Sequence, residues 1–311
     1  MNKVNAETVK YIKLGRRGAW ERLCLGDGTL RFGYPDVPHD LALDGDIDRL
    51  RRFFLDRGDD PKVASSHANQ IHCFYHAEPH TLWITVAEGF VWWCFSRTGV
   101  EHLGGDKEER EARGARLRHT VDGWRNTSLA GRPLRVSELN GRLTKVAAYQ
   151  MTICNVEARA YLLRRINDED LPEAVSAKAA RSAALDSIRS LLKLLTWKDF
   201  ELLVDLVFAQ SGWRRIGATG GSQKTVDLEF ELPSTGERAF AQVKSSTNQA
   251  QLDDYVERLA WRDEERMFFV YHSGPRQLTT SDPRVVLIGP SRLADMVFQA
   301  GLFDWLLEKA N

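Results

Sequence analysis

Three polar residues in two neighbouring apolar runs have the types and the spacing for metal-assisted chemistry. Asp227 lies where apolar and acidic residues alternate, which predicts a strand with Asp227 on the side away from the core. Gln242 and Lys244 lie two positions apart in a second strand-like run, residues 239–244, so both project from the same face. The turn at residues 233–236 closes a hairpin, which brings Asp227 near Gln242 and Lys244.

These residue types suit the hydrolysis of a phosphodiester bond with the help of a divalent cation. Mg²⁺ prefers oxygen ligands, and Asp227 offers a carboxylate while Gln242 offers a neutral amide oxygen. Lys244 can hold the attacking water or hydroxide and offset the negative charge that develops on the phosphate. We therefore predict Asp227, Gln242 and Lys244 as catalytic residues, with Mg²⁺ or Mn²⁺ as the cofactor.

A helix before the hairpin supplies a further carboxylate. Apolar residues recur at helical spacing over residues 197–208, and Gly212 is placed to end the helix. Glu201 follows Phe200 at the edge of the apolar stripe, from where it can reach the site. We expect Glu201 to be a catalytic residue that contacts the metal through water.

The order of these motifs resembles the catalytic core of Mrr-like restriction endonucleases, which belong to the PD-(D/E)XK nuclease superfamily. The residues that carry the resemblance are Asp199-Phe-Glu201, Gly212, Gly220-Gly221, Asp227 and Gln242-Val-Lys244. In that family a helix glutamate, a strand aspartate and a Q-x-K or E-x-K strand form the site. Gln242 stands where the superfamily name expects an acidic residue, as is common in Mrr-like members, and it leaves a one-metal or two-metal mechanism open.

The remaining C-terminal sequence predicts an α/β domain of the restriction-endonuclease type, with a central mixed sheet flanked by helices. Asn248 is positioned to cap a helix whose apolar stripe ends at Leu259. Strands over residues 267–271 and 284–288 and a helix near Leu293 complete the sheet and its cover.

The length of 311 residues suggests two domains. Residues 167–172 are polar and acidic and end in Pro, and residues 173–195 have the apolar spacing of a long helix. We expect a nucleic-acid or modified-base recognition domain at residues 1–165, a linker helix at 166–196 and the nuclease domain at 197–311.

The N-terminal half predicts an α+β domain. Its expected elements are a strand at 30–34, helices at 47–55 and 62–75, a hairpin of strands at 81–86 and 90–95, and a strand region at 143–155. This order and the aromatic hairpin resemble the PUA-like readers of modified bases, which include the EVE and SRA domains. The resemblance implies a partial barrel that reads a base.

Tryptophans and arginines are the candidate nucleic-acid contacts of this half. Trp92 and Trp93 can stack a flipped base, although adjacent strand residues face opposite ways, so at most one lines a pocket. Residues 1–165 hold 26 Lys and Arg against 21 Asp and Glu, a net charge of +5. Arg116 and Arg118 lie in the most basic part and are our candidates for phosphate contacts, with a solvated face as the alternative.

A cluster of histidines offers an alternative metal site. Its members are His67, His72, Cys73, His76 and His80. His72, His76 and His80 are four positions apart and would share a helix face, but Pro79 disfavours a helix that continues to His80. We therefore favour a polar contact for His72 or His76 over a zinc site.

The composition is that of an ordinary globular protein, with 43% hydrophobic and 28% charged residues. The four cysteines, Cys24, Cys73, Cys94 and Cys154, form no C-x-x-C pair, which predicts reduced thiols. Residues 1–11 are polar, and no run is long enough to span a membrane. We expect a cytoplasmic protein.

Together these features predict an endonuclease that hydrolyses phosphodiester bonds in DNA, of the modification-dependent restriction or phage-defence type. DNA, with or without modified bases, is then its partner, and cleavage of both strands leads us to expect a homodimer. Two alternatives stay open. One is a non-catalytic sensor whose N-terminal domain binds a nucleotide or modified nucleic acid, and the other is an effector directed at RNA.

Overall fold

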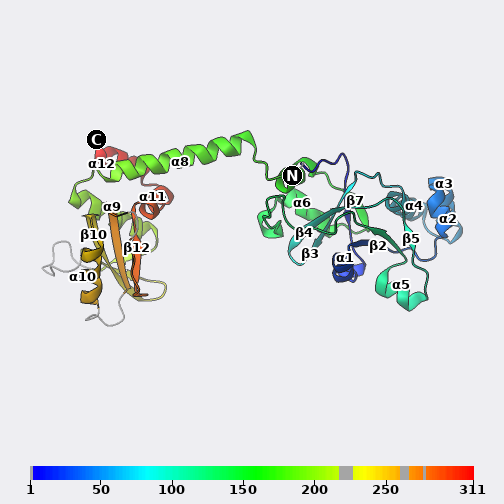
Figure 1. Ribbon diagram of the computed structural model, residues 1–311, viewed down its shortest axis with the longest axis horizontal. Coiled ribbons are helices and arrows are strands. Elements are labelled where there is room, and N and C mark those ends of the chain that lie inside the picture. The colour runs from blue at the N-terminus through cyan, green and yellow to red at the C-terminus, as the bar shows by residue number, and fades with distance from the viewer. Residues whose placement is uncertain (1–2, 217–226, 260–265, 276–277) are drawn as a thin grey trace. The chain divides into compact units, whose positions relative to one another are not determined.

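A computed structural model describes residues 3–216, 227–259, 266–275 and 278–311. Internal contacts divide the chain into two compact units, Met1–Leu171 and Pro172–Asn311 (Figure 1). The Gly220-Gly221 pair of the sequence motif lies outside the described residues. In the described part of the chain, every helix is too short or too polar to traverse a lipid bilayer.

Unit 1 combines helices with two small sheets. Its elements, with 3₁₀ helices marked η, are β1 (Val9–Ile12), η1 (Arg16–Gly18), α1 (Glu21–Asp27), β2 (Thr29–Phe32), α2 (His39–Asp44), α3 (Ile47–Asp56), α4 (Pro61–Tyr75), β3 (Leu82–Ala87), β4 (Phe90–Phe95), β5 (Glu101–His102), α5 (Lys107–Arg113), β6 (Arg116–His119), η2 (Val136–Glu138), α6 (Gly141–Thr144), η3 (Lys145–Ala148), β7 (Ile153–Asn155) and α7 (Arg159–Ile166). The larger sheet has the order β4-β3-β1-β7, in which only β1 and β3 are parallel, and the smaller has the antiparallel order β2-β6-β5. The described strands thus form two sheets, and a PUA-like partial barrel stays a prediction.

The hairpin of β3 and β4 forms where the sequence predicts it. Its turn residues Glu88 and Gly89 have φ angles of 53° and 80°. Two successive positive φ angles are typical of the tight turns that match the twist of a hairpin, and glycine adopts them without strain. The turn fixes the register in which Trp83 pairs with Cys94 and Ile84 with Trp93.

Residues 143–155 differ from the strand region that we expected. The Asn140 side chain accepts a hydrogen bond from the Arg142 backbone N–H at 2.8 Å and so caps α6. The helical turns of α6 and η3 occupy the first part of this region, and only β7 at its end is a strand. The Asn140 cap starts a helix in a segment whose apolar pattern alone predicts a strand.

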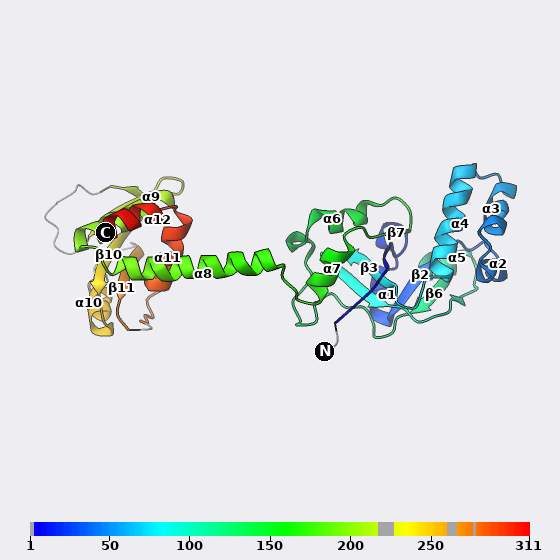
Figure 2. The same cartoon turned by 90° about the horizontal axis from the view of Figure 1, so that it is seen from above.

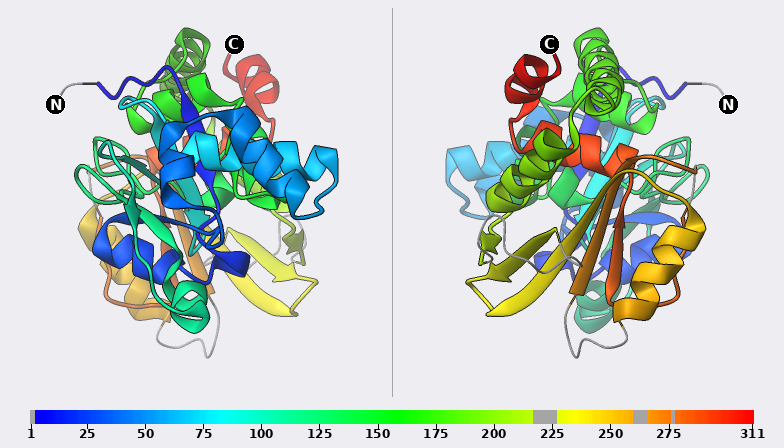
Figure 3. Two further views of the ribbon diagram at one scale, coloured as in Figure 1. Left: turned by 90° about the vertical axis from the view of Figure 1, so that its right-hand side faces the viewer. Right: turned by 90° about the vertical axis from the view of Figure 1, so that its left-hand side faces the viewer.

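Unit 2 has a mixed sheet flanked by helices, the α/β architecture expected for the C-terminal half (Figure 3). Its elements are α8 (Pro172–Leu192), α9 (Trp197–Gln210), β8 (Arg214–Arg215), β9 (Leu228–Leu232), β10 (Glu237–Ser246), α10 (Gln249–Leu259), β11 (Arg266–Ser273), β12 (Val285–Ile288), α11 (Pro290–Gln299) and α12 (Phe303–Ala310). The strand order is β12-β11-β10-β9-β8. β10, β11 and β12 are parallel, whereas β9 is antiparallel to both β10 and β8.

The two faces of β10 contact separate hydrophobic cores. Ala241 and Val243 belong to the core under α9 and α11, which also contains the rings of Phe208 and Phe230, stacked with centroids 4.8 Å apart. Phe240 belongs to the other core, which α10 covers. Because side chains alternate along a strand, Gln242 and Lys244 lie on the same face as Phe240.

The helix α8 is part of unit 2. Leu185, Ile188 and Leu192 recur at the predicted helical spacing and are buried in the core with α11 and α12. Residues 173–184 of the same helix are mostly exposed. The region 166–196, expected as a linker helix, therefore holds the end of α7 in unit 1 and all of α8 in unit 2.

Capping side chains fix where the helices before and after the hairpin begin. Thr196 accepts a hydrogen bond from the Asp199 backbone N–H at 3.2 Å at the start of α9. Asn248 accepts one from the Gln251 backbone N–H at 3.0 Å, which confirms the cap predicted for α10. Each cap satisfies a donor that the helix itself leaves free.

Neighbouring leucines on α9 test how much its buried face stabilises unit 2. Leu203 is fully buried, whereas Leu202 is 43% exposed. We predict that Leu203→Ala lowers the free energy of unfolding by about 2–5 kcal/mol, because it leaves a cavity under α9. Leu202→Ala is the matched control and should change it by less than about 1 kcal/mol. Urea unfolding followed by circular dichroism measures both, and equal losses would contradict the packing of α9.

Candidate functional site

The pairing of β9 with β10 places the Asp227 carboxylate against Gln242. Leu228 pairs with Ala241 in antiparallel register, so Asp227, one residue earlier, comes opposite Gln242. The Asp227 oxygen Oδ2 accepts hydrogen bonds from the backbone N–H of Val243, at 2.7 Å, and from the side-chain amide of Gln242. Two donors on β10 therefore hold this carboxylate in place.

Gln242 contributes a buried amide oxygen next to this carboxylate. The residue is 2% exposed, and its Oε1 has no hydrogen-bond partner among the described residues. Leaving a buried acceptor unpaired costs about 1–3 kcal/mol, so such an atom in a native protein calls for a ligand, an ion or a water. An amide oxygen beside a carboxylate is a donor set that suits a hard cation.

Lys244 lies two residues further along the same face of β10. Its Nζ is 5.2 Å from the centre of the Tyr255 ring on α10, and the ring therefore stabilises the ammonium group and limits where it can point. Arg258 lies over the same ring at 5.4 Å. The Lys244 residue is half-buried.

Glu201 approaches this group of residues from α9. Phe200, its neighbour, is fully buried, and this fixes Glu201 at the edge of the helix face, half-buried. Burial raises the pKa of the Glu201 carboxyl, and the nearby charge of Asp227 raises it further, while Lys244 and Arg215 lower it. Glu201 is therefore close enough to Asp227 and Lys244 for their charges to act on it.

Arg215 and Asp205 add a charged pair that the sequence analysis did not select. The Arg215 Nη1 lies 3.1 Å from the Asp205 Oδ2, and both side chains are half-buried. Asp205 follows Glu201 by one helical turn, so their spacing in the sequence already indicates that the two carboxylates lie on the same side of α9. The position of Arg215 could not be predicted in this way, because β8 has only two residues and so shows no alternation of polar and apolar side chains.

The donor set fits Mg²⁺ or Mn²⁺. Asp227 and Glu201 offer carboxylates, and Gln242 offers the buried amide oxygen. Among the residues that the structure describes, no group of three or more His, Cys, Asp or Glu side chains is arranged to hold a metal. Mg²⁺ is commonly bound by one or two carboxylates while it keeps water ligands, whereas Zn²⁺ prefers His and Cys.

Arg116 and Arg118 are buried in unit 1, which corrects the expectation that they contact phosphate. Arg116 is 0% exposed and donates to the Tyr75 hydroxyl and to three backbone carbonyls of the loop after β2. Arg118 is 1% exposed and donates to the backbone carbonyls of Phe74 and Arg97. Their guanidinium groups join β6 to the end of α4, a place where cations are favourable.

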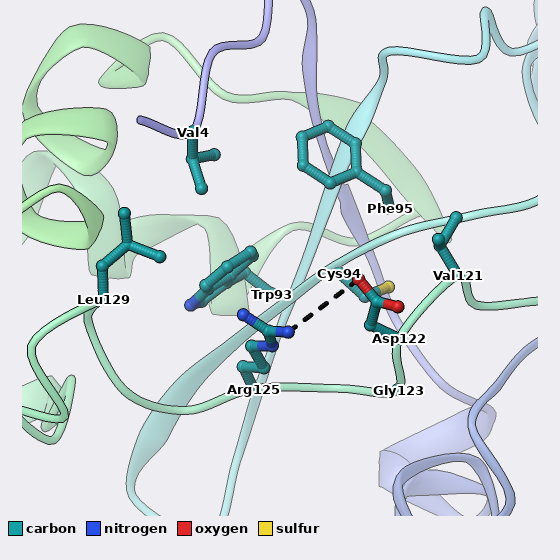
Figure 4. A pocket seen from close by; sticks show the side chains of 9 residues that line it. All are labelled: Val4, Trp93, Cys94, Phe95, Val121, Asp122, Gly123, Arg125 and Leu129. Atoms are coloured by element: carbon teal, nitrogen blue, oxygen red, sulfur yellow. Dashed lines mark ion pairs between the residues drawn. The ribbon is translucent and has the colours of Figure 1, made fainter. Parts of the chain in front are cut away.

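Trp93 lines a cavity of about 270 Å³ in unit 1 (Figure 4). The Arg125 guanidinium lies 5.5 Å from the centre of the Trp93 ring and 3.8 Å from the Asp122 carboxylate. The indole N–H of Trp93 donates to the Thr127 backbone carbonyl at 2.9 Å and fixes the ring. The apolar part of the lining is Val4, Phe95, Val121 and Leu129.

Trp92 points to the other side of β4, as strand geometry requires. Its indole N–H donates to the Ala87 backbone carbonyl at 3.1 Å, and its ring packs against the core that contains Trp83 and Phe74. Both rings pack against hydrophobic cores. Trp93 is 4% exposed, and of the two candidate tryptophans it is the one that also lines the cavity.

The histidine cluster makes structural contacts. His67 lies 3.1 Å from the Asp59 carboxylate, and His76 contacts the Ala42 backbone carbonyl at 3.0 Å. The rings of His72 and His76 are stacked with centroids 4.9 Å apart. Burial, and then the neighbouring His76, lower the pKa of His72. These contacts give His67 and His76 partners within unit 1.

Comparison with known proteins gives one similarity. No family model matches the sequence, and no curated protein matches it. Among solved structures, the chain is similar to the MspJI restriction endonuclease in complex with a 27-mer oligonucleotide, at 17% identity and a TM-score of 0.27. The similarity covers 74% of this chain and 63% of that one.

Arg116 can be tested as a structural residue. We predict that Arg116→Ala lowers the free energy of unfolding by about 3–5 kcal/mol, because it leaves buried carbonyls without donors. Arg51→Ala, at an exposed position on α3, removes the same charge and should change stability by less than about 0.5 kcal/mol. Thermal unfolding of the two variants measures both changes. An Arg116→Ala protein as stable as wild type would show that the buried hydrogen bonds of Arg116 do not stabilise unit 1.

Proposed function

We propose that this chain is a Mg²⁺- or Mn²⁺-dependent DNA endonuclease of the modification-dependent restriction type. Unit 2 hydrolyses the phosphodiester bond, and unit 1 selects DNA that contains modified bases. The observation that carries the proposal is the buried amide oxygen of Gln242, which has no hydrogen-bond partner in the described part of the chain, beside the Asp227 carboxylate and with Lys244 on the same strand face.

Each residue of the site has a distinct part in this proposal. Asp227 and Gln242 would hold the cation through a carboxylate and an amide oxygen, and Glu201 would contact it through water. When bound, such a cation polarises the phosphate and makes a water more acidic. Lys244, whose position the Tyr255 ring limits, orients the attacking water and offsets the negative charge that grows on the phosphate oxygens.

The Trp93 cavity is our candidate for the base-reading site of unit 1. Its volume of about 270 Å³ is close to the lower end of ordinary ligand pockets. The side chains of Trp93 and Phe95 line it, and bases stack on aromatic side chains of this kind. Arg125 and Asp122 supply a donor and an acceptor for the edge of a base.

Nucleases with one active site usually cut both strands of a duplex as a pair, so we propose that two copies of the chain act together. The same donor set would also serve the hydrolysis of RNA, and the unit 1 cavity would also serve a sensor that does not cleave. Incubation with modified DNA, unmodified DNA and RNA in parallel separates these alternatives. We expect the modified DNA to be cleaved faster than the unmodified DNA and the RNA.

Lys244→Ala tests the assignment of the active site. We predict a loss of DNA cleavage on the order of 100-fold or more, with Mn²⁺ binding largely retained, because a protonated amine is not a metal ligand. Lys198→Ala removes an exposed lysine from α9 and should keep wild-type activity. Plasmid nicking and calorimetric Mn²⁺ titration give the two readouts. Wild-type turnover in Lys244→Ala would refute the assignment.

Trp93→Ala tests the reading of the base. We predict that it removes the preference for modified over unmodified duplex in fluorescence anisotropy, whereas Trp92→Ala keeps the ratio of the two affinities. Arg125→Ala changes a side chain that is 40% exposed, so it tests the same cavity with little effect on the core, and it should also reduce the ratio. An unchanged ratio in both Trp93→Ala and Arg125→Ala would exclude this cavity as the reader.

A further inference from the structure

A second cavity of unit 1, the α6–α7 cleft, has a strongly basic lining. It measures about 360 Å³ and lies between two helices that are neighbours in the fold (Figure 2). Three cationic side chains face one carboxylate in it. The polar lining residues are Asn140, Arg142, Lys145, Glu157, Tyr161 and Arg164.

The positive charge of the cleft is available to a ligand. Arg142 and Arg164 form no ion pair with any described residue of the chain. Lys145 and Glu157 are paired at 3.1 Å, but their side chains are 60% and 82% exposed. Such an exposed pair contributes little to stability, so an anion can replace Glu157 as the partner of Lys145.

A hydroxyl group adds a neutral donor to the same cleft. The Tyr161 oxygen accepts a hydrogen bond from the Asn140 backbone N–H at 3.0 Å. Its own proton is not used in that bond and can be donated to a ligand. The Asn140 side chain is occupied by the Arg142 backbone N–H, which fixes the loop that presents Arg142.

The two helices that border the cleft are both anchored in the hydrophobic core. Leu143 of α6 and Leu162 of α7 are both fully buried in the same hydrophobic cluster. Each lies within two residues of a cation of the cleft, Arg142 or Arg164. The two guanidinium groups therefore start from rigid backbone, which lowers the entropy lost when they bind.

The helix α7 also connects the cleft to the Trp93 cavity. Arg164 lines the cleft, and two residues later the Ile166 carbonyl accepts a hydrogen bond from the Leu129 backbone N–H at 2.8 Å. Leu129 lines the Trp93 cavity. One helix end therefore borders both places, and a nucleic acid has the aromatic and the anionic groups that they suit.

We infer that the α6–α7 cleft binds the phosphodiester backbone of DNA and so anchors the duplex whose base is read at Trp93. This inference rests on the proposed function, because it takes DNA as the partner. It relocates the phosphate contacts of unit 1 from Arg116 and Arg118, which are buried, to Arg142, Lys145 and Arg164. Backbone contacts of this kind add affinity without sequence preference.

Salt-dependent binding of the full chain tests the inference in EDTA, where no cleavage occurs. We expect Arg142→Ala with Arg164→Ala to weaken binding of a fluorescein-labelled duplex about ten-fold, and to reduce the slope of log Kd against log salt by about 2. Arg51→Ala with Arg52→Ala removes the same charge from exposed positions on α3 and should leave both quantities near wild type. Glu157→Gln frees Lys145 and should tighten binding about three-fold.

The tighter binding expected of Glu157→Gln cannot arise from misfolding. Arg142→Glu, at an exposed position, is a second variant that should weaken binding. An unchanged slope in the Arg142 and Arg164 variant, or an equal loss in the α3 control, would overturn the inference. So would a Glu157→Gln protein that binds no more tightly than wild type. Plasmid cleavage with Mg²⁺ is measured separately, so a failure of the nuclease assignment leaves the salt slopes interpretable.

Discussion

The Asp227 carboxylate accepts a hydrogen bond from the Val243 backbone N–H and another from the Gln242 side chain. These two bonds join Asp227, the residue before β9, to the middle of β10, one position beyond the strand pair of Leu228 with Ala241. They also orient the Gln242 amide so that its oxygen is buried and meets no hydrogen-bond donor among the residues that the structure describes. The geometry of the candidate active site therefore depends on this one carboxylate, which fixes the orientation of the Gln242 amide.

The rest of unit 2 positions this interaction from both faces of the sheet. On one face, Ala241 and Val243 pack under α9, and the same helix brings the carboxyl of Glu201 within range of Asp227. On the other face, Tyr255 of α10 receives the ammonium group of Lys244. Because the side chains of β10 alternate between two cores, the strand brings its own polar side chains close to Glu201 of α9 on one side and to Tyr255 of α10 on the other. In unit 1 the same alternation on β4 separates Trp93 from Trp92.

Strong local signals in the sequence predicted much of this arrangement. The stripe of α9, the Asn248 cap and the alternation around Asp227 and Gln242 each depend on neighbours within a few residues. The side chains of Arg116 and Arg118 depend instead on what β6 packs against, and composition alone cannot tell a buried arginine from a solvated one. For the same reason the sequence did not select Arg164 or the pair of Arg215 with Asp205, whose partners are brought together only by the fold.

A calorimetric titration of Mn²⁺ into the full chain and two Gln242 variants is the most direct test of the active site. If Gln242 Oε1 is a ligand, Gln242→Glu binds Mn²⁺ at least as tightly as wild type, because it places a carboxylate where the amide oxygen was. Gln242→Leu keeps a similar volume without an oxygen and should then bind about ten-fold more weakly or worse. Clearly weaker binding by Gln242→Glu, or wild-type binding by Gln242→Leu, would contradict the assignment of a metal site at Asp227 and Gln242.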